Sequence, residues 1–449
     1  MSLKRSRVLS ARLSPVALAL ALLGPHSARA EDLVELYNAA RAYDATYLSA
    51  RALSDSAEFR AAQAHSLRLP TVGLSTSSTR TENDFPVNHP VTGTPRAGST
   101  TTQLGVSGIQ PIFNRANSAT IAQADKTLDI ARADLDTAEQ DLIVRVAQTY
   151  FDVLAAQDTL ATTRASKAAI TEQLASAKRN FEVGTATITD TREAQARFDL
   201  ATAQEIAADN DLVTKRIALD QLVGRSNVQP NQLAVPVALP ATAAIPVDEL
   251  VSRAAEEHPA VRRARVALDV AQLETEKARA QRLPTVDAVA SVQSGRGTIA
   301  ANVTGYNSVG SIGLQVNVPL YSGGAMQNRI RETLVLEDRS RNDLEAARRA
   351  VIQTTRQAYY TLQSSAAQVK ALEAAEASSQ LALEATQLGY RVGIRVNVDV
   401  LNAQSQLYQT RRDLARARYD LLLGTLRLRQ ASGRLVPSDI LGIDALLVR

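Results

Sequence analysis

The chain has 449 residues with no cysteine, no tryptophan and 4% aromatic residues, which excludes disulfide cross-links and argues against a large globular core. Its formal charge of +4 overstates its basic character, because residues 1–30 contain five basic residues and no acidic one. Without that segment the charge is near −1, so the composition does not indicate a nucleic-acid-binding protein and no nucleic-acid partner is expected.

The N-terminal segment has the pattern of a secretory signal peptide. Lys4, Arg5 and Arg7 precede an apolar stretch at residues 16–23, and residues 28–30 form a small-x-small cleavage motif. The apolar stretch is too short to span a bilayer as a stable helix, and cleavage is expected near Ala30. No cysteine follows, so a lipid anchor is not expected. Beyond this segment no apolar run approaches about 20 residues, so insertion into a membrane would require strands.

A first structural unit is expected over residues 31–225. It begins with a helix at about 32–67 and continues with strands at about 69–80 and 101–113. Two long helices follow, at about 114–183 and 190–223, because residues 114–183 contain neither proline nor glycine and show leucines and valines seven residues apart. Such heptads indicate antiparallel coiled-coil packing, and about 70 residues of helix extend about 105 Å.

A second unit, residues 248–433, repeats the first after a linker at 226–247. Residues 68–72 (Arg-Leu-Pro-Thr-Val) recur at 282–286, and Phe-Glu-Val-Gly at 181–184 corresponds to Tyr-Arg-Val-Gly at 390–393. The shared proline and glycine positions indicate an internal duplication. The ranges expected in this unit are strands at about 284–295 and 306–320, long helices at about 324–392 and 399–430, and a C-terminal tail at 434–449.

The strands alternate in polarity. Ile312, Leu314 and Val316 are separated by Gly313 and Gln315, which is typical of a barrel strand between lipid and water, or of a sheet that covers a soluble core. Polar connections at residues 81–101 and 295–306 resemble extracellular loops and favour the barrel. Phe113 and Tyr321, at the opposite strand ends, are expected to lie at the membrane interface. Four strands cannot close a barrel, so oligomerisation is required, and the sequence alone permits a dimer.

Two turns separate the paired long helices. Gly184 and Gly393 fall where a helix ends, and Asp190 and Asp399 fall where the next helix begins. One interpretation is a C′ glycine followed by an acidic N-cap. The functional interpretation is that several copies of these turns form a narrow entrance.

The whole of residues 31–449 resembles the TolC family in its efflux and type I secretion branch. The signal peptide, the duplicated units and the motifs at 181–190 and 390–399 carry this resemblance. It implies a mainly α-helical homotrimer with a twelve-stranded barrel in outer-membrane lipid and a helical tunnel in the periplasm. It also implies docking to a periplasmic adaptor (membrane fusion) protein and an ABC, RND or MFS transporter of the inner membrane.

The resemblance also implies roles for residues at the turns. Tyr390 and Arg395 would form a clasp that holds the tip closed, with Thr189 and Asp190 as acceptors. Asp399 would be the acid of a cation-binding ring. Asn402 replaces the second acid found in well-known members, so a less acidic entrance with weaker cation block is expected.

No catalytic, metal-binding or cofactor-binding set is expected. The four histidines have no metal-ligand spacing, and no glycine-rich segment is followed by the lysine of a phosphate loop. The function expected is therefore a passive exit duct of a tripartite export system, for type I protein secretion or small-molecule efflux. The alternative is a periplasmic coiled-coil adaptor or scaffold without a pore. A trimeric coiled-coil adhesin is disfavoured, because its short repeats and C-terminal barrel strands are missing from the sequence.

Overall fold

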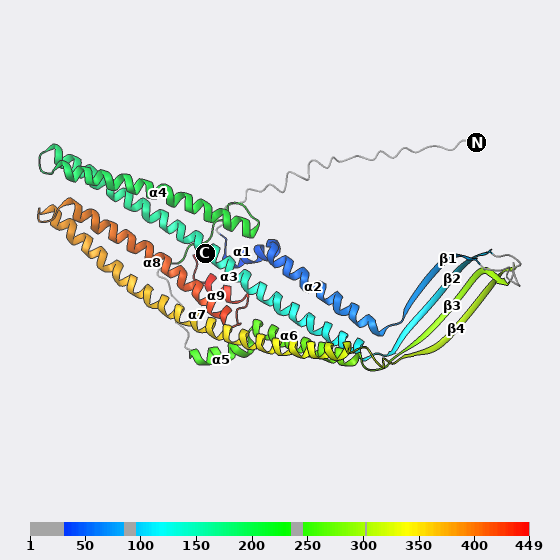
Figure 1. Cartoon of the computed structure of the whole chain (residues 1–449). Helices are drawn as coiled ribbons and strands as arrows, with labels where there is room; N and C mark the ends of the chain where they lie inside the picture. Colours follow the sequence, from blue (N-terminus) through cyan, green and yellow to red (C-terminus); the bar gives the residue numbers. More distant parts are fainter. Residues whose placement is uncertain (1–30, 85–95, 235–245, 301–302, 449) are drawn as a thin grey trace, which may run out of the picture.

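The computed structural model of the chain describes residues 31–84, 96–234, 246–300 and 303–448, so the expected signal peptide lies outside the described residues. The molecule is elongated. Four strands lie at one end, and helices run from them to two turns at the opposite end (Figure 1). Within the described ranges, no helix has the length and apolar character needed to cross a membrane.

One antiparallel sheet joins the two halves of the chain. Its strands follow the order β1-β2-β3-β4, and the central pairing places Val106 of β2 opposite Val292 of β3. In the described chain, β1 and β4 each have one edge without a neighbouring strand. The strand bounds are Thr71–Asp84 (β1), Arg96–Phe113 (β2), Thr285–Ala300 (β3) and Val303–Asn317 (β4).

The strands extend into segments expected to be loops. β1 and β2 remain paired out to Asp84 opposite Arg96, and β3 and β4 remain paired to Ala300 opposite Val303. The connection expected at 295–306 is therefore almost entirely strand, and residues 85–95 of the other connection lie outside the described residues. Threonine is common in strands, and a polar side chain on the exposed face of a strand looks the same in sequence as one in a loop. β4 ends before Pro319, which cannot donate to a ladder.

The first half contains a helical break that the sequence analysis did not anticipate. Instead of one helix over 32–67, α1 ends at Tyr43 and α2 begins at Ala45. Asp44 has an extended backbone and its carboxylate accepts from the Tyr47 N–H at 2.8 Å, so it caps α2. The helix bounds are Leu33–Tyr43 (α1), Ala45–His65 (α2), Arg115–Glu182 (α3) and Ile188–Val223 (α4), with a 3₁₀ turn at Ser66–Arg68 (η2).

The second half repeats this break at His258. Pro259 occupies the first position of α6, where its missing N–H is not needed, and the His258 ring accepts from the Ala260 N–H at 3.1 Å. Burial lowers the pKa of His258, which favours the neutral ring that this bond requires. The helix bounds are Val247–Glu257 (α5), Pro259–Ala280 (α6), Ala325–Arg391 (α7) and Asn397–Ala431 (α8).

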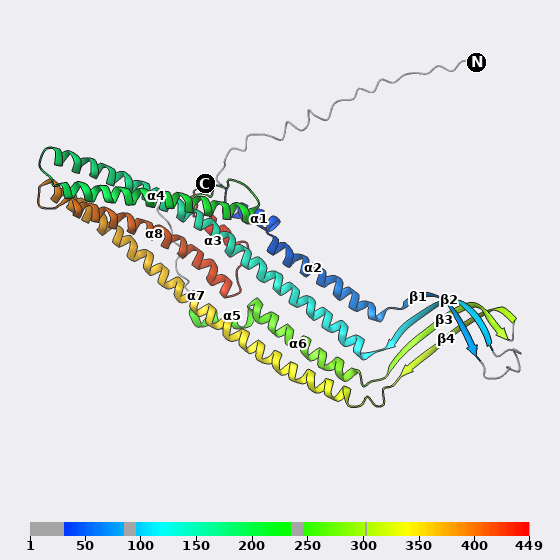
Figure 2. The same cartoon turned by 45° about the horizontal axis from the view of Figure 1, so that its top comes forward.

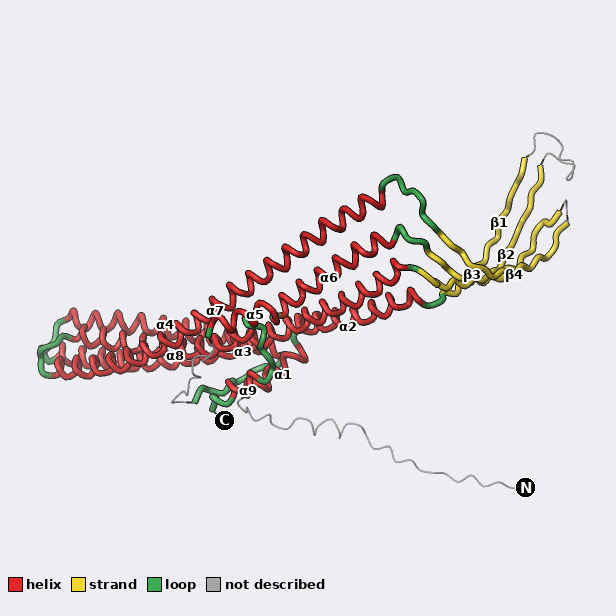
Figure 3. Tube along the Cα trace, turned by 90° about the horizontal axis from the view of Figure 1, so that it is seen from below, coloured by secondary structure: helices red, strands yellow, loops and turns green. Residues whose placement is uncertain are grey.

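The helices form four columns that continue the order of the strands. Next to the sheet the order is α2, α3, α6 and α7, and toward the turns it is α4, α3, α8 and α7. The long helices α3 and α7 run through both levels, whereas shorter helices stacked end to end form the other two columns (Figures 2 and 3). The outer columns are therefore α2 with α4 on one side and α7 on the other.

The largest hydrophobic cluster lies at mid-height, where α3 meets α8. Tyr150 and Phe151 of α3 are buried, and Phe151 stacks on Tyr419 of α8 with ring centroids 5.7 Å apart. The Tyr419 hydroxyl donates to Asp158 at 2.6 Å. Burial raises the pKa of Asp158, although this hydrogen bond and the charge of Arg418 act in the opposite direction. Heptad leucines of α8 are buried along its length: Leu407, Leu414, Leu421 and Leu428.

The C-terminal segment is part of this core rather than a loose tail. A short helix, Asp439–Asp444 (α9), buries Ile440 and Ile443 in the mid-height cluster. The Asp444 carboxylate accepts from the Leu33 N–H at 2.9 Å, which ties the C-terminal segment to α1. Leu447 also pairs with Leu233 of the segment between the two halves.

Candidate functional site

The two turns named in the sequence analysis lie together at the end of the molecule farthest from the sheet (Figure 2). Gly184 and Gly393 have φ values of 79° and 82°, which favour glycine, and each follows the C-cap residue of a long helix. The Thr185 N–H donates to the Asn180 carbonyl at 2.8 Å, and the Ile394 N–H donates to Gly389 at 2.9 Å. Both glycines thus occupy the C′ position that reverses the chain.

The turn acids stabilise the starts of α4 and α8, but they are not the N-cap residues. Thr187 is the N-cap of α4, and Asp190 is the third helical residue. The two form a reciprocal capping box in which the Asp190 carboxylate accepts from the Thr187 N–H at 3.0 Å. In α8 the N-cap is Val396, whose side chain has no acceptor, so only the long 3.5 Å contact to Asp399 is available. Asp399 is therefore the less constrained of the two acids.

Helices α3 and α4 with the turn between them form the first hairpin, and α7 and α8 form the second. Tyr390, in the last turn of α7, contacts the first hairpin. Its hydroxyl accepts from the Asn180 side-chain amide at 3.2 Å. Within the described residues Tyr390 has no hydrogen bond to Thr189 or Asp190, the acceptors named in the sequence analysis. Asp190 instead accepts, through its backbone carbonyl, from the Asn397 amide at 3.4 Å. The two hairpins are thus linked at the tip by amide side chains.

Arg395 lies in the turn between α7 and α8. Its guanidinium is 3.6 Å from the Asp399 carboxylate, with the two side chains 61% and 35% exposed. A Cβ at Gly389 would stand 2.8 Å from the Arg395 Cγ, so Gly389 leaves the space in which the arginine stem lies. Within the described residues Arg395 forms no hydrogen bond or ion pair with Thr189 or Asp190.

Asn402 lies one helical turn from Asp399 and forms a hydrogen bond with an arginine of the first hairpin. Its side-chain oxygen accepts from Arg197 of α4 at 2.8 Å. Nearby, buried Asn397 accepts from the Gln173 side-chain amide. Asn180, Gln173, Arg197 and Asn397 were not identified from the sequence. Asn180 and Asn397 lie four residues from the two glycines, which was the available signal for them, whereas Gln173 and Arg197 lie farther along the helices and only the fold shows that they face the other hairpin.

The sheet at the opposite end has two chemically different faces. Because directly opposed residues share a face, Leu74, Val106, Val292, Ile312 and Leu314 lie on one side. Ile312 is 89% and Leu314 is 72% exposed. The other face carries polar residues such as Ser75, Gln103, Gln293, Ser311 and Gln315. Neither face is covered by other described parts of the chain, because almost every strand side chain is exposed or half-buried.

Phe113 and Tyr321 lie where the sheet joins the helices. Phe113 is the last residue of β2, and Tyr321 follows β4 in the connection to α7. Both side chains are exposed, and Tyr321 is 89% exposed. Both residues therefore lie at the boundary between the sheet and the helices.

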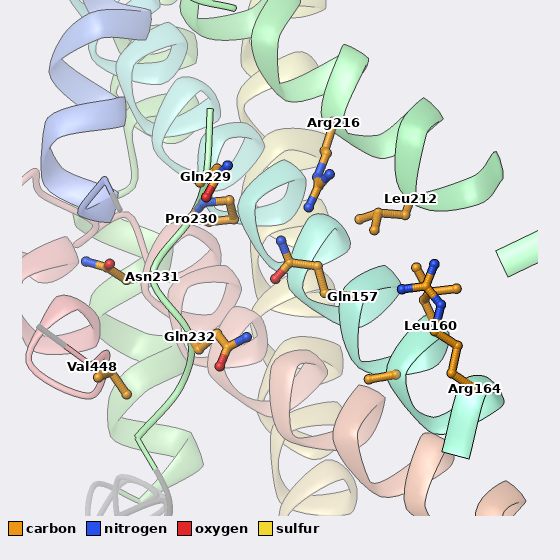
Figure 4. Close-up of a pocket in the computed structure, with 11 residues that line it drawn as sticks. Gln157, Leu160, Arg164, Leu212, Arg216, Gln229, Pro230, Asn231, Gln232 and Val448 are labelled. Carbon is orange, nitrogen blue, oxygen red and sulfur yellow. The ribbon is translucent and has the colours of Figure 1, made fainter. Parts of the chain in front are cut away.

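A pocket of about 600 Å³ opens beside the mid-height cluster (Figure 4). Gln157, Arg164 and Arg216 face residues 229–232 across it. Arg164 pairs with Glu205 and Asp209, and the Nε of Arg216 is buried without a hydrogen-bond partner. The pocket has no nucleophile paired with a base. Across the described ranges, no group of three or more histidine or acidic side chains is placed to bind a metal ion.

Comparison with known proteins relates this architecture to bacterial outer-membrane proteins. The family described as outer membrane efflux protein matches residues 36–225 and again 250–434. Outer membrane protein TolC of Vibrio cholerae is 33% identical over 420 residues, which cover 93% of this chain and 94% of that protein. Alkaline protease secretion protein AprF of Pseudomonas aeruginosa is 34% identical over 303 residues, 67% of this chain and 63% of that protein.

A solved structure supports the fold independently. The CmeC outer membrane channel of Campylobacter jejuni superposes with a TM-score of 0.77 over 98% of both chains, at 15% sequence identity. The arrangement of sheet, columns and tip is thus shared by a protein whose sequence has diverged widely.

Proposed function

The chain belongs to the outer membrane efflux protein family, and from this premise we propose that it is the outer-membrane exit duct of a tripartite export system, a passive tunnel built from three copies. The observation that carries the proposal is the sheet with one apolar face, one polar face and two open edges. Such a sheet is unstable alone in water, since its apolar face and its unpaired edge groups both need partners. Lipid supplies the first partner, and a copy of the same sheet supplies the second.

The helical body supports the same assembly. Away from the tip, its exposed large apolar side chains on the columns lie only on α2, α4 and α7, the outer columns, and not on the described central helices α3, α6 and α8. Ile206, Val213 and Ile217 follow coiled-coil spacing on α4, and Leu381 and Leu388 are seven residues apart on α7. Packing α7 of one copy against α2 and α4 of the next buries both stripes and continues the four-column order.

Three copies give a closed structure with twelve strands and twelve helical columns. Four strands are too few for a transmembrane barrel, for which about eight is the smallest number. The family resemblance selects three copies over two. The duplicated organisation, with units at 31–225 and 248–433, is supported by the two separate segments that match the family.

The proposed orientation places the sheet in the outer membrane and the helices in the periplasm. Phe113 and Tyr321 would mark the periplasmic side of the lipid. The 68 residues of α3 extend about 102 Å at 1.5 Å per residue, which is enough to reach far from the membrane. A signal peptide cleaved near Ala30 would direct export.

The proposed partners are a periplasmic adaptor and an inner-membrane ABC, RND or MFS transporter. The tip presents exposed apolar side chains at both turns: Val183, Ile188, Val392, Ile394 and Val396. A cluster of exposed apolar side chains is a surface suited to a protein partner. AprF is named for protease secretion, so type I protein secretion is one candidate activity beside small-molecule efflux.

The proposed gate is the ring of tip residues. Arg395 and Tyr390 of each copy would contact Thr189 and Asp190 of a neighbouring helix, and the Asp399 side chains would form the acidic ring. Asn402, bound by Arg197, makes this ring less acidic than one with a second carboxylate. A pore-free periplasmic scaffold accounts for none of these features, and it leaves the apolar face of the sheet in water.

Disulfide cross-linking between subunits tests the assembly. Ile217 lies 29 residues from the tip-side end of α4, and Tyr360 lies 31 residues from the tip-side end of α7, so both are about 45 Å from the tip. The chain has no cysteine, so the double variant Ile217→Cys/Tyr360→Cys provides the only thiols. Covalent trimers are expected on oxidation, whereas either single variant should remain monomeric in denaturing gels. A ladder that stops at covalent dimers would rule out three copies.

A pair of adjacent substitutions tests membrane insertion. Leu314→Arg places a charge on the apolar face, at a cost of about 2–4 kcal/mol near the bilayer centre. Gln315→Arg places the same charge at the next residue of the strand, which lies on the polar face of the sheet. Leu314→Arg should therefore reduce the amount of protein in the outer-membrane fraction, and Gln315→Arg should not. Equal recovery of both variants would contradict the lipid-facing assignment.

A further inference from the structure

A second, smaller pocket lies between the two hairpins, closer to the tip than the pocket at mid-height. Its volume is about 250 Å³, and helices α3, α4 and α8 line it. Buried Ile170 and Ala201 contribute apolar surface, and most of the remaining lining is polar. Because α4 belongs to the first hairpin and α8 to the second, any ligand held here would bridge the two hairpins.

The charged residues that line this pocket are Arg197 of α4 and Arg412 of α8, and no acidic residue lines it. Within the described chain, Arg197 forms no ion pair and binds only the neutral Asn402. Arg412 is paired with the adjacent Asp413 at 3.2 Å, with its side chain 49% exposed. Because only Arg412 of these two arginines is paired with a carboxylate, which itself lies outside the lining, the pocket carries a net positive charge.

Several neutral groups in the pocket add hydrogen-bond donors. Thr162, Ser166 and Tyr408 supply hydroxyls, and Gln204 and Gln409 supply amides. Thr163 and Ser405 already donate to backbone carbonyls of their own helices, at 2.8 and 2.9 Å. Guanidinium, hydroxyl and amide donors converging on one space match an oxyanion, whose oxygens only accept.

The pocket is small. Its volume of about 250 Å³ lies below the range of about 300–1,000 Å³ that is usual for sites of drug-sized ligands, so it suits a small anion with part of its hydration shell.

We propose that this pocket between α4 and α8 binds a small oxyanion, of the phosphate or carboxylate class, which ties the first hairpin to the second through Arg197 and Arg412. Binding itself does not depend on the proposed duct. Its consequence does: by joining the hairpins near the tip, the anion opposes their separation and stabilises the closed entrance.

Titration calorimetry with sodium phosphate tests the site. The chain from residue 31 onward would be purified in detergent without lipid, in sodium chloride of matched ionic strength. Saturable binding is expected, with succinate competing for it. Arg197→Gln and Arg412→Gln should each weaken phosphate binding about tenfold or more, since each removes charge-assisted hydrogen bonds. Arg416→Gln is the matched control, because Arg416 is on α8, is 79% exposed and does not line the pocket.

Three results would overturn the proposal: no saturable phosphate binding, equal weakening by Arg416→Gln, or normal binding by both pocket variants. Circular dichroism would confirm the helical content of each variant. If either arginine variant misfolds, Ser166→Ala takes its place as a smaller change in the same pocket, and it should weaken phosphate binding. Failure here is distinguishable from failure of the duct, since a protein that conducts normally but does not bind phosphate refutes the anion site alone.

Discussion

Replacing Arg395 with serine is expected to open the resting tip. In the single chain Arg395, in the turn before α8, is paired with Asp399 in the first turn of α8, and both side chains are partly exposed. In the proposed trimer the same arginine contacts Thr189 and Asp190 of a neighbouring helix. The substitution removes this contact from all three copies and leaves α7 and α8 intact.

The expected size of the shift toward the open channel follows from how exposed the Arg395 side chain is. An ion pair with one partner 61% exposed contributes about 1 kcal/mol or less, because water and salt screen it. Opening also lets Arg395 return to Asp399, which lowers the net contribution further. Three copies therefore contribute at most about 3 kcal/mol, or a shift of roughly 100-fold in the ratio of closed to open channels. Such a bias keeps the channel closed at rest without locking it.

Planar-bilayer conductance measures this shift directly. The unmodified protein should show a small, steady conductance, and Arg395→Ser should show a larger one. Arg391→Ser is the matched control, since Arg391 is exposed at the same turn and forms no ion pair within the described residues. An unchanged conductance in Arg395→Ser, or an equal rise in Arg391→Ser, would refute the clasp. No conductance from protein shown to be folded and trimeric would refute the duct.

Three further substitutions test the tip and the core. Gly389→Ala should raise the conductance in the same bilayer assay, because its Cβ would displace the arginine stem at 2.8 Å without removing the charge. Thr355→Val should lower stability by about 1–2 kcal/mol in thermal unfolding, because the buried hydroxyl donates to the last turn of α8 at 2.7 Å, whereas exposed Thr361→Val should have little effect. Asp158→Asn should raise the unfolding midpoint at pH 7, since burial raises the pKa of the folded carboxyl and makes its ionised form costly. That advantage should vanish as the pH falls through the raised pKa, where the native carboxyl is protonated too, and the control Asp211→Asn, at an exposed position of α4, should leave the unfolding midpoint at pH 7 unchanged.

The long helices could be predicted closely because their signals are local. Heptad spacing and the absence of proline and glycine placed α3, and the internal repeat placed α7, within a residue or two of their observed ends. Gly184 and Gly393 were identifiable as C′ residues, since few other residues adopt a positive φ there. The strands were harder to bound, because a polar residue in a loop and one on the water-facing side of a strand look alike in sequence.

The side-chain partners at the tip could not be predicted, because they depend on how two hairpins far apart in the chain face each other. Asn180 and Tyr390 are separated by 210 residues, and Arg197 and Asn402 by 205. Heptad spacing gives the stripe that a helix buries, but it does not give the rotation of one hairpin against another. The break at Asp44 was missed for a different reason: aspartate is tolerated inside a helix, and its role as a cap is visible only in its extended backbone.

Stability and function occupy different levels of the molecule. The mid-height cluster, where α3, α8, α1 and α9 meet, supplies most of the fully buried side chains, whereas the sheet and the tip are exposed in the single chain. Folding of one copy therefore depends chiefly on the middle, and in the proposed trimer the two ends would reach their final environment only when copies associate. Substitutions in the core such as Thr355→Val should reduce the stability of the subunit itself. Substitutions at the sheet or the tip should leave the subunit folded and change insertion or gating instead, because the side chains at both ends are exposed in the single chain.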